Sequence, residues 1–216
     1  MTPEEQAKHI ETGRVLFARH IEFMLSVVDL KGLPPSDLPE VCFAGRSNVG
    51  KSSLINALTN QNGLARASNT PGRTRELNYF NADDRLRLVD LPGYGYARAS
   101  KTDIARWTKL TRAFLAGRAA LRRVFLLIDS RHGLKPGDLD IMAMLDETAV
   151  TYQIVLTKSD KIKVGELAKV EEKTLKAIAK RPAAHPELLY TSSVKKPGLD
   201  MVRAEIGRLA LHDHRL

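Results

Sequence analysis

The sequence has little of what marks several large classes of protein. It holds one cysteine, Cys42, among 216 residues, so we exclude an internal disulfide framework and expect a reducing compartment. No run approaches the ~18 apolar residues that a membrane-spanning helix needs. The first residues are acidic rather than basic, unlike a secretory signal, and "LHDHRL" at 211–216 offers no cysteine to a prenyl group. We therefore expect a cytoplasmic protein without a membrane anchor.

Positive charge, by contrast, is in excess. Lys and Arg number 34 against 25 Asp and Glu, which gives a formal net charge of +9. The excess is spread along the chain and forms no long basic tail. A polyanionic partner explains such a bias, and so does a basic solvated surface without a specific partner, so composition leaves both open. The six histidines show no metal-ligand spacing, and we assign no zinc.

Apolar runs typical of strands alternate with segments of helical period. This alternation predicts an α/β fold of three layers, in which helices cover both faces of a mostly parallel central sheet. The predicted strands are 21–30, 40–45, a hairpin around Asp83 and Asp84, 124–130, 152–156 and 187–190. The predicted helices begin at Pro3, after a Thr2 cap, and continue with 51–60, 102–117, 137–147, 165–181 and 199–211. Trp107 is then expected in the core.

Three prolines in "GLPPSDLP" at 32–39 forbid regular structure there. We place a domain boundary at this point. The expected organisation is an N-terminal helix and extra strand packed on the core (residues 1–38), a core domain (39–211) and a short C-terminal tail (212–216).

The stretch "GRSNVGKS" combines two glycines five positions apart with a lysine and a hydroxyl. Between a predicted strand and a predicted helix, this pattern is typical of a loop whose backbone N–H groups surround a polyphosphate. Lys51 is placed to bridge the outer phosphates, and the Ser52 hydroxyl to coordinate Mg²⁺. A chance match in a chain of this length is on the order of 1% or less.

Three further polar clusters follow predicted strand ends, where ligands bind in open α/β sheets. In "DLPG", Asp90 is the expected acidic partner of the metal, and the Gly93 N–H can sense a terminal phosphate. In "TKSD", the Asp160 carboxylate can accept two hydrogen bonds from guanine, whereas adenine would leave it unpaired. The Lys158 stem can lie along the purine face. In "TSS" at 191–193, small residues let a backbone N–H approach the guanine carbonyl.

Two of these clusters have an ordinary structural alternative. "DLPG" can be a simple turn, and Asp160 can be a helix cap in a basic loop. Their order along one chain favours the nucleotide site.

In this order, the clusters resemble the motifs of a translation-factor-related GTPase. The missing threonine motif lies in "NTPGRTRELNYF", which offers Thr70 and Thr74. We choose Thr74, because "PGRT" before a strand resembles the Era and EngA relatives, whose corresponding threonine closes over Mg²⁺. Together, "GRSNVGKSSLINAL", "TPGRTRELNYF", "DLPGYGYA" and "TKSDK" resemble the EngB (YihA/YsxC) family of the TrmE-Era-EngA-EngB-Septin-like GTPases. The likeness covers about residues 20–211.

The resemblance implies a P-loop GTPase fold, with residues 39–211 as the G domain, and Mg²⁺-dependent hydrolysis of GTP to GDP that works as a conformational switch. It implies a cytoplasmic protein that binds guanine nucleotide, acts in assembly of the large ribosomal subunit through rRNA or ribosomal proteins, and is required for normal cell division and septation. We expect a monomer. The implied catalytic residues are Lys51, Thr74 and Gly93, and the metal ligands are Ser52, Thr74 and Asp90. The residues expected to contact the nucleotide are Gly45, Arg46, Ser47, Asn48, Val49, Gly50, Lys51, Ser52, Ser53, Gly72, Arg73, Thr74, Arg75, Glu76, Asp90, Leu91, Pro92, Gly93, Thr157, Lys158, Ser159, Asp160, Thr191, Ser192 and Ser193.

One departure from Ras-type enzymes concerns the residue after "DLPG". Ras-type enzymes have a water-orienting glutamine there, whereas this chain has Tyr94. A phenol is a poor substitute, so we predict slow intrinsic hydrolysis. Asn48 resembles the potassium-coordinating asparagine of MnmE-type GTPases, which would let K⁺ neutralise developing charge. The alternative is that Asn48 only rigidifies the loop.

The expected switch segments are 61–75 and 93–101, ordered by the γ-phosphate and released on hydrolysis. Basic residues in and after the second segment could face rRNA or form a solvated helix face: Arg98, Lys101, Arg106, Lys109 and Arg112. A P-loop ATPase or small-molecule kinase is the main rival, but it has no use for Asp160 at a strand end. A membrane-linked signalling GTPase would want a lipidation signal.

Overall fold

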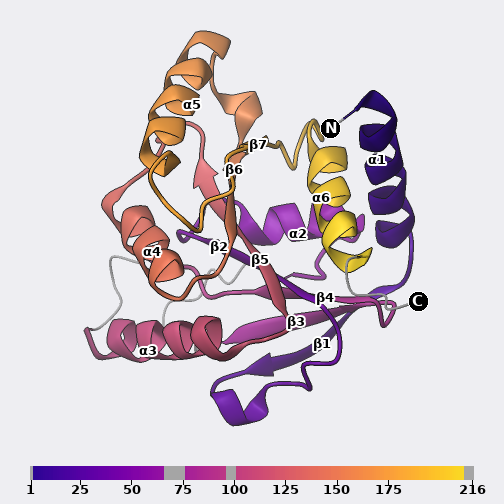
Figure 1. Cartoon of the computed structure of the whole chain (residues 1–216), viewed down its shortest axis with the longest axis vertical. Helices are drawn as coiled ribbons and strands as arrows, with labels where there is room; N and C mark the ends of the chain where they lie inside the picture. The colour runs from indigo at the N-terminus through magenta and orange to yellow at the C-terminus, as the bar shows by residue number, and fades with distance from the viewer. Residues whose placement is uncertain (1, 66–75, 96–100, 212–216) are drawn as a thin grey trace.

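The computed structural model of the chain describes residues 2–65, 76–95 and 101–211. Within these residues, one seven-stranded sheet has the order β1-β3-β4-β2-β5-β6-β7 (Figure 1). Its strands are β1 (Ile21–Val27), β2 (Glu40–Gly45), β3 (Leu77–Ala82), β4 (Leu86–Asp90), β5 (Leu121–Asp129), β6 (Tyr152–Thr157) and β7 (Leu189–Tyr190). The helices are α1 (Pro3–Phe17), α2 (Lys51–Thr59), α3 (Lys101–Gly117), α4 (Pro136–Glu147), α5 (Val164–Ile178) and α6 (Leu199–Leu211), with 3₁₀ turns at Leu30–Gly32 and Ser159–Lys161.

The sheet is parallel from β4 through β2, β5 and β6 to β7, and β3 pairs antiparallel with both of its neighbours, β4 and β1. The predicted hairpin is confirmed: Asp83 and Asp84 link β3 to β4 with φ of 52° and 51°. Two consecutive positive φ angles give the turn a twist that matches the strands. Two predicted strands are shorter than expected, because β1 ends at Val27 and β7 spans two residues.

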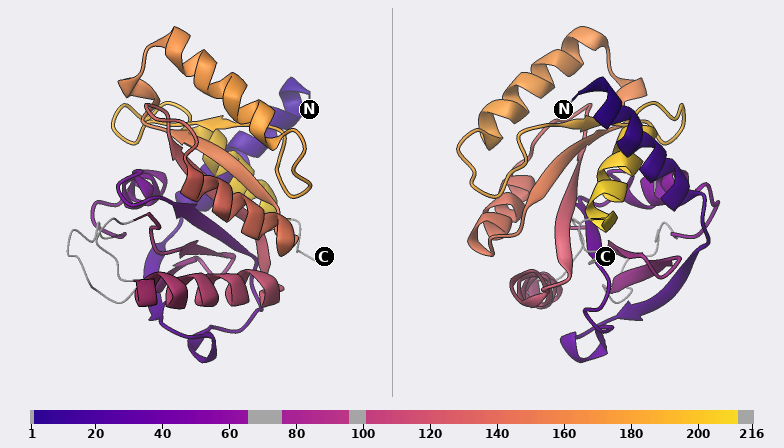
Figure 2. Two further views of the ribbon diagram at one scale, coloured as in Figure 1. Left: turned by 90° about the vertical axis from the view of Figure 1, so that its left-hand side faces the viewer. Right: turned by 45° about the vertical axis from the view of Figure 1, so that its right-hand side comes forward.

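Alternation along the central strand β2 separates two cores. Val41 and Phe43 pack with α1, α2 and α6 on one face of the sheet, whereas Cys42 and Ala44 pack with α3, α4 and α5 on the other. Successive side chains of a strand point to opposite faces, so a fully apolar strand needs helices on both. The three-layer α/β fold is therefore confirmed, and Figure 2 shows helices on both sides of the sheet. Trp107 is in the core as expected, 7% exposed.

The N-terminal segment is joined to the sheet and to the last helix. Thr2 caps α1, since its side chain accepts a hydrogen bond from the Glu5 N–H and its own N–H donates to the Glu5 carboxylate. The helices α1 and α6 lie side by side (Figures 1 and 2), and they touch through Gly13 and Gly207. A Cβ on Gly13 would lie 2.4 Å from the Arg203 carbonyl carbon. The boundary at residue 38 stays a prediction.

Within the described residues, none of the helices combines the length and the apolar composition needed to cross a bilayer.

Candidate functional site

The four predicted clusters lie at one edge of the sheet. Gly45, Asp90 and Thr157 are the last residues of β2, β4 and β6, and Thr191 directly follows β7. All four strands are parallel, so their carboxyl ends open on the same side, where α/β folds bind ligands. The register places Phe43 beside Asp90 and Asp129 beside Thr157.

The glycine loop is a tight turn between β2 and α2. Gly50 has φ of 104° and Asn48 has φ of 66°, conformations that suit glycine and asparagine. A Cβ on Gly45 would lie 2.8 Å from Val49 Cγ1 and 3.1 Å from the Leu127 carbonyl oxygen. The loop ends at the N-terminus of α2, whose first N–H groups have no intrahelical acceptors and therefore suit an anion.

Lys51 and Asp90 form an ion pair at the mouth of this loop. Their side chains are 11% and 9% exposed, so the ammonium and the carboxylate are largely removed from water. Lys51, which the sequence predicts at the outer phosphates, is therefore paired with Asp90, which the sequence predicts at the metal. Ser52 follows Lys51 in α2.

Hydroxyl and carboxylate oxygens are the ligands that Mg²⁺ prefers, so Ser52 and Asp90 fit the ion by chemistry. Among the described residues, no group of three or more His, Cys, Asp or Glu could hold a metal by itself. A magnesium ion at this site would therefore take most of its ligands from phosphate and water, as is usual for this ion in phosphate-binding sites.

The "DLPG" segment runs directly along the glycine loop. Tyr94 N–H donates to the Gly45 carbonyl at 3.3 Å, and Ser47 N–H donates to the Tyr94 carbonyl at 2.9 Å. A Cβ on Gly93 would lie 3.1 Å from Ser47 Oγ, so only a glycine allows this close approach without a shift.

The Tyr94 side chain is buried against α4. Its hydroxyl donates to Asp138 Oδ1 at 2.7 Å, and Asp138 Oδ2 accepts from the Lys135 N–H at 2.8 Å. Burial, followed by the nearby Asp138 charge, raises the pKa of Tyr94 well above its usual range. The phenol is thus held against α4 as a neutral group.

Asp160 is a buried carboxylate that is only partly satisfied. Its side chain is 4% exposed, and the nearest cation to Oδ2 is Lys161 Nζ at 3.7 Å. Within the described residues, Oδ2 has no hydrogen-bond partner. A hydrogen bond from the Ser192 hydroxyl is the main cause that lowers the pKa of Asp160. A buried, ionised oxygen without a donor fits a ligand edge that carries N–H groups, as guanine does.

The "TSS" segment, which follows β7, lies beside the Asp160 carboxylate. Thr191 N–H donates to the Leu156 carbonyl at 2.8 Å, and Ser159 N–H donates to the Thr191 carbonyl at 3.1 Å. Ser192 is fully buried and Ser193 half-buried. The structure therefore brings "TSS" beside "TKSD".

Hydrogen bonds join the "TKSD" loop to the glycine loop. Lys158 Nζ donates to the Asn48 carbonyl at 2.7 Å, and Thr157 Oγ1 donates to the Val49 carbonyl at 2.8 Å. Lys158 Nζ also contacts Asp129 Oδ2 at 2.9 Å.

Asp129 was missed by the sequence analysis, although it is the polar end of the apolar run "VFLLIDS". Burial raises the pKa of Asp129, but hydrogen bonds from Arg131 and Lys158 outweigh it, and the net pKa lies well below the usual range.

Several predicted site residues lie outside the described residues, namely Gly72, Arg73, Thr74 and Arg75, with the rejected Thr70 and the basic Arg98. Glu76 immediately precedes β3 and is half-buried. Leu91 is buried, and Arg46 lies 3.5 Å from Asp138 through Nε. Ser53 is exposed on α2, and Pro92 is half-buried.

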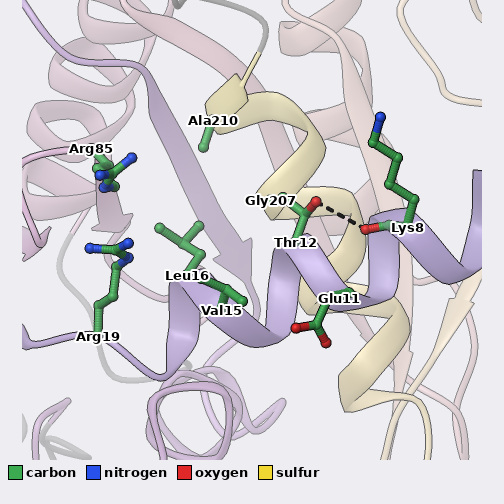
Figure 3. Close-up of a pocket in the computed structure, with 9 residues that line it drawn as sticks. All are labelled: Lys8, Glu11, Thr12, Val15, Leu16, Arg19, Arg85, Gly207 and Ala210. Atoms are coloured by element: carbon green, nitrogen blue, oxygen red, sulfur yellow. Dashed lines mark hydrogen bonds between the residues drawn. The ribbon is translucent and has the colours of Figure 1, made fainter.

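A separate cavity of about 330 Å³ lies between α1, α6 and the hairpin turn (Figure 3). Its wall is mostly apolar, with Leu16 and Ala210, and the guanidinium groups of Arg19 and Arg85 face each other beside it. Arg85 precedes β4, whereas Asp90 ends it, so this cavity lies toward the opposite edge of the sheet from the four clusters.

Comparison with known proteins places the chain among GTPases. Residues 40–158 match the family described as "50S ribosome-binding GTPase". A protein of Rhodospirillum rubrum described as "Probable GTP-binding protein EngB" is 55% identical over 212 residues, with 96% of this chain and 92% of that one covered. A protein of Caulobacter vibrioides with the same description is 58% identical, with 97% and 90% covered.

Solved structures agree in fold. The crystal structure of a probable GTP-binding protein engB has a TM-score of 0.64 at 22% identity, with 80% of this chain and 99% of that one covered. Era of Aquifex aeolicus bound to GDP and AlF4⁻ has a TM-score of 0.59 at 20% identity, with 80% and 56% covered.

Proposed function

This chain belongs to the EngB family of GTP-binding proteins and is a GTPase, and we propose that it binds Mg²⁺-complexed GTP and GDP at the carboxyl edge of its sheet. In this proposal the base lies at Asp160 and the phosphates lie at the glycine loop. The observation that carries the proposal is the buried Asp160 Oδ2, which has no hydrogen-bond partner within the described residues. Guanine supplies two N–H donors to such a carboxylate, while adenine presents an acceptor.

The proposed reaction is in-line attack of water on the γ-phosphate. Lys51 leaves Asp90, contacts the transferred phosphoryl group and stabilises the negative charge of that group. The Gly93 N–H senses the same phosphate. Bound Mg²⁺, held by Ser52, Asp90 and Thr74, would neutralise charge on the phosphate oxygens.

We propose slow intrinsic hydrolysis, and Tyr94 supports it. Its hydroxyl is bonded to Asp138 and is therefore not available to orient water. Potassium at Asn48 is the proposed accelerator. The side chain of Asn48 is exposed, while its carbonyl is held by Lys158. Turnover that is equal in matched potassium and sodium buffers would remove this part of the proposal.

The proposed output is a conformational switch used in assembly of the large ribosomal subunit, and through it in cell division and septation. The matched family's description as ribosome-binding supports this role, as does the net charge of +9. On α3, Arg106 and Lys109 are exposed, whereas Arg112 pairs with Glu147. We therefore propose Arg106 and Lys109 as rRNA contacts of a monomeric, cytoplasmic protein.

Calorimetric titration with GDP, GTP and ATP tests the nucleotide assignment. We expect binding of both guanine nucleotides and no measurable binding of ATP. Asp160→Asn should weaken GDP binding and shift the preference toward xanthosine diphosphate, whose extra carbonyl accepts from an amide N–H. Asp140→Asn, at an exposed position on α4, is the matched control and should change neither affinity. Tight binding of ATP would overturn the assignment.

Co-sedimentation with ribosomal subunits tests the proposed partner. We expect binding to the large subunit with a GTP analogue and less with GDP, and weaker binding at higher salt, because counterion release drives contacts with RNA phosphates. Charge reversal of Arg106 and Lys109 should reduce binding, whereas Lys176→Glu on α5 should not. Equal weak binding under all conditions would contradict the role in assembly.

A further inference from the structure

Asp129 occupies the end of the strand that separates the two halves of the site. The sheet order is β2, β5, β6, so β5 lies between the strand that leads into the glycine loop and the strand that leads into "TKSD". Asp129 is the last residue of β5 and pairs in register with Thr157 of β6. Its side chain is 5% exposed.

The Asp129 carboxylate accepts hydrogen bonds from Arg131 and from Lys158. Arg131 donates to Oδ1 from its backbone N–H at 3.0 Å and from Nε at 2.9 Å, and to Oδ2 from Nη2 at 2.8 Å. Lys158 Nζ donates to Oδ2 at 2.9 Å and to the Asn48 carbonyl at 2.7 Å. The chain of contacts therefore runs from Arg131 through Asp129 and Lys158 to the glycine loop.

Both residues that this chain of contacts joins have a left-handed backbone, which asparagine tolerates but lysine rarely adopts. Lys158 has φ of 57° and Asn48 has φ of 66°. The left-handed region is unfavourable for a lysine by ~1–2 kcal/mol, and such outliers persist where surrounding contacts hold them in place. The two contacts of Lys158 Nζ are contacts of this kind.

We propose that Asp129 is a positioning residue for the guanine nucleotide: its carboxylate holds Lys158 Nζ on the Asn48 carbonyl and so couples the "TKSD" loop to the shape of the glycine loop. This inference rests on the proposed nucleotide site. The Asn48 peptide is planar, so fixing its carbonyl also orients the turn that leads to Gly50 and the start of α2. Without the carboxylate, the lysine loses the anion that directs it toward the loop.

The test replaces Asp129 by asparagine, which preserves shape and removes the charge. We expect GDP affinity, measured by calorimetry on the full chain, to fall about tenfold, equivalent to ~1.4 kcal/mol, and GDP to dissociate faster. The matched control is Asp146→Asn. Asp146 accepts from Arg181 Nη1 at 2.8 Å and from the Ala183 N–H at 3.2 Å, near the start of β6 and away from the site. It should lower thermal stability without changing GDP affinity.

A double-mutant cycle separates positioning from a structural role. In a Lys158→Met background, Asp129→Asn should change GDP affinity less than twofold, because the group through which it acts is gone. Additive losses in the cycle would show that Asp129 acts by another route and would overturn the proposal. An unchanged affinity in the single variant Asp129→Asn would overturn it as well.

If Asp129→Asn does not fold, Arg131→Gln gives the same decision. It leaves the carboxylate in place but removes two of its three donors from Arg131, so we expect a loss of about threefold in GDP affinity, and no loss would contradict the proposal. Wild-type protein that fails to bind GDP would instead mean that the proposed nucleotide site itself is wrong.

Discussion

Tyr94→Phe removes a single hydroxyl from the buried contact between the "DLPG" segment and α4. Tyr94 is 4% exposed and Asp138 is fully buried, and the hydrogen bond between them is 2.7 Å long. The variant retains the aromatic ring, which lies 6.0 Å from the Trp107 ring between centroids, and both backbone hydrogen bonds of Tyr94.

The expected loss of stability follows from the charge on Asp138. Hydrogen bonds to ionised groups contribute ~1.5–3 kcal/mol, and Asp138 keeps the Lys135 N–H and the 3.5 Å contact with Arg46 as its remaining partners. For a chain of this size, 1 kcal/mol corresponds to ~2–4 °C in Tm. We therefore expect Tm to fall by about 3–12 °C in thermal unfolding followed by circular dichroism.

The same variant should leave catalysis nearly unchanged. Because the hydroxyl is engaged by Asp138, phosphate release at saturating GTP should stay within about twofold of wild type, whereas loss of a true water-orienting group is of the order of 10²-fold or more. The matched control is Tyr79→Phe: Tyr79 is fully buried, and its hydroxyl has no hydrogen-bond partner within the described residues. Removing it should not lower Tm. An unchanged Tm in Tyr94→Phe, or a tenfold slower hydrolysis, would refute the reasoning.

Two further predictions concern the glycine loop and the pH dependence of stability. Gly45→Ala places a Cβ 2.8 Å from Val49 Cγ1 and 3.1 Å from the Leu127 carbonyl oxygen, so urea unfolding should show that the unfolding free energy falls by ~1–3 kcal/mol, and GDP binding should weaken. The control is Gly117→Ala, because no atom lies within 4 Å of the added Cβ. An equal effect of both variants would contradict the steric argument. Asp129 has a pKa lowered from 3.8 in the folded protein, so its stabilisation is present above pH 3.8 and is lost as the pH falls toward the folded pKa. The unfolding free energy of wild type should therefore fall more steeply than that of Asp129→Asn between pH 4 and pH 2.5, and parallel curves would contradict the assignment.

Much of the fold could be predicted because its signals are local. The apolar run at β2 and the helical period of α3 depend on neighbours a few positions apart, and the Asp83–Asp84 turn depends on two residues. Placement of the four polar clusters at one edge also followed, since parallel strands end on the same side. Strand length was less predictable: β7 has two residues, because pairing with β6 is limited to Leu189 and Tyr190, a long-range property.

In the candidate site, too, local features could be predicted from the sequence and long-range contacts could not. The glycine loop and "TKSD" were found from spacing, because each places its chemistry within eight residues. Tyr94 was recognised as a departure from the Ras pattern, but its partner Asp138 lies 44 residues away, and nothing in the spacing indicated it. Asp129 was missed because a carboxylate at a strand end is common. What distinguishes Asp129 is its contact with Lys158, which lies 29 residues later in the chain.

By itself, the sequence determined the α/β architecture, the position of the glycine-rich loop between a strand and a helix, and the membership of the chain in a GTPase family. Only the tertiary structure decided which charged and polar groups face one another: Lys51 with Asp90, Lys158 with Asp129 and Tyr94 with Asp138. The physical reason is that hydrophobic periodicity repeats along the chain and can be read locally. An ion pair or a buried hydrogen bond, in contrast, has many equivalent partners among 34 basic and 25 acidic residues, and packing in three dimensions selects one of them.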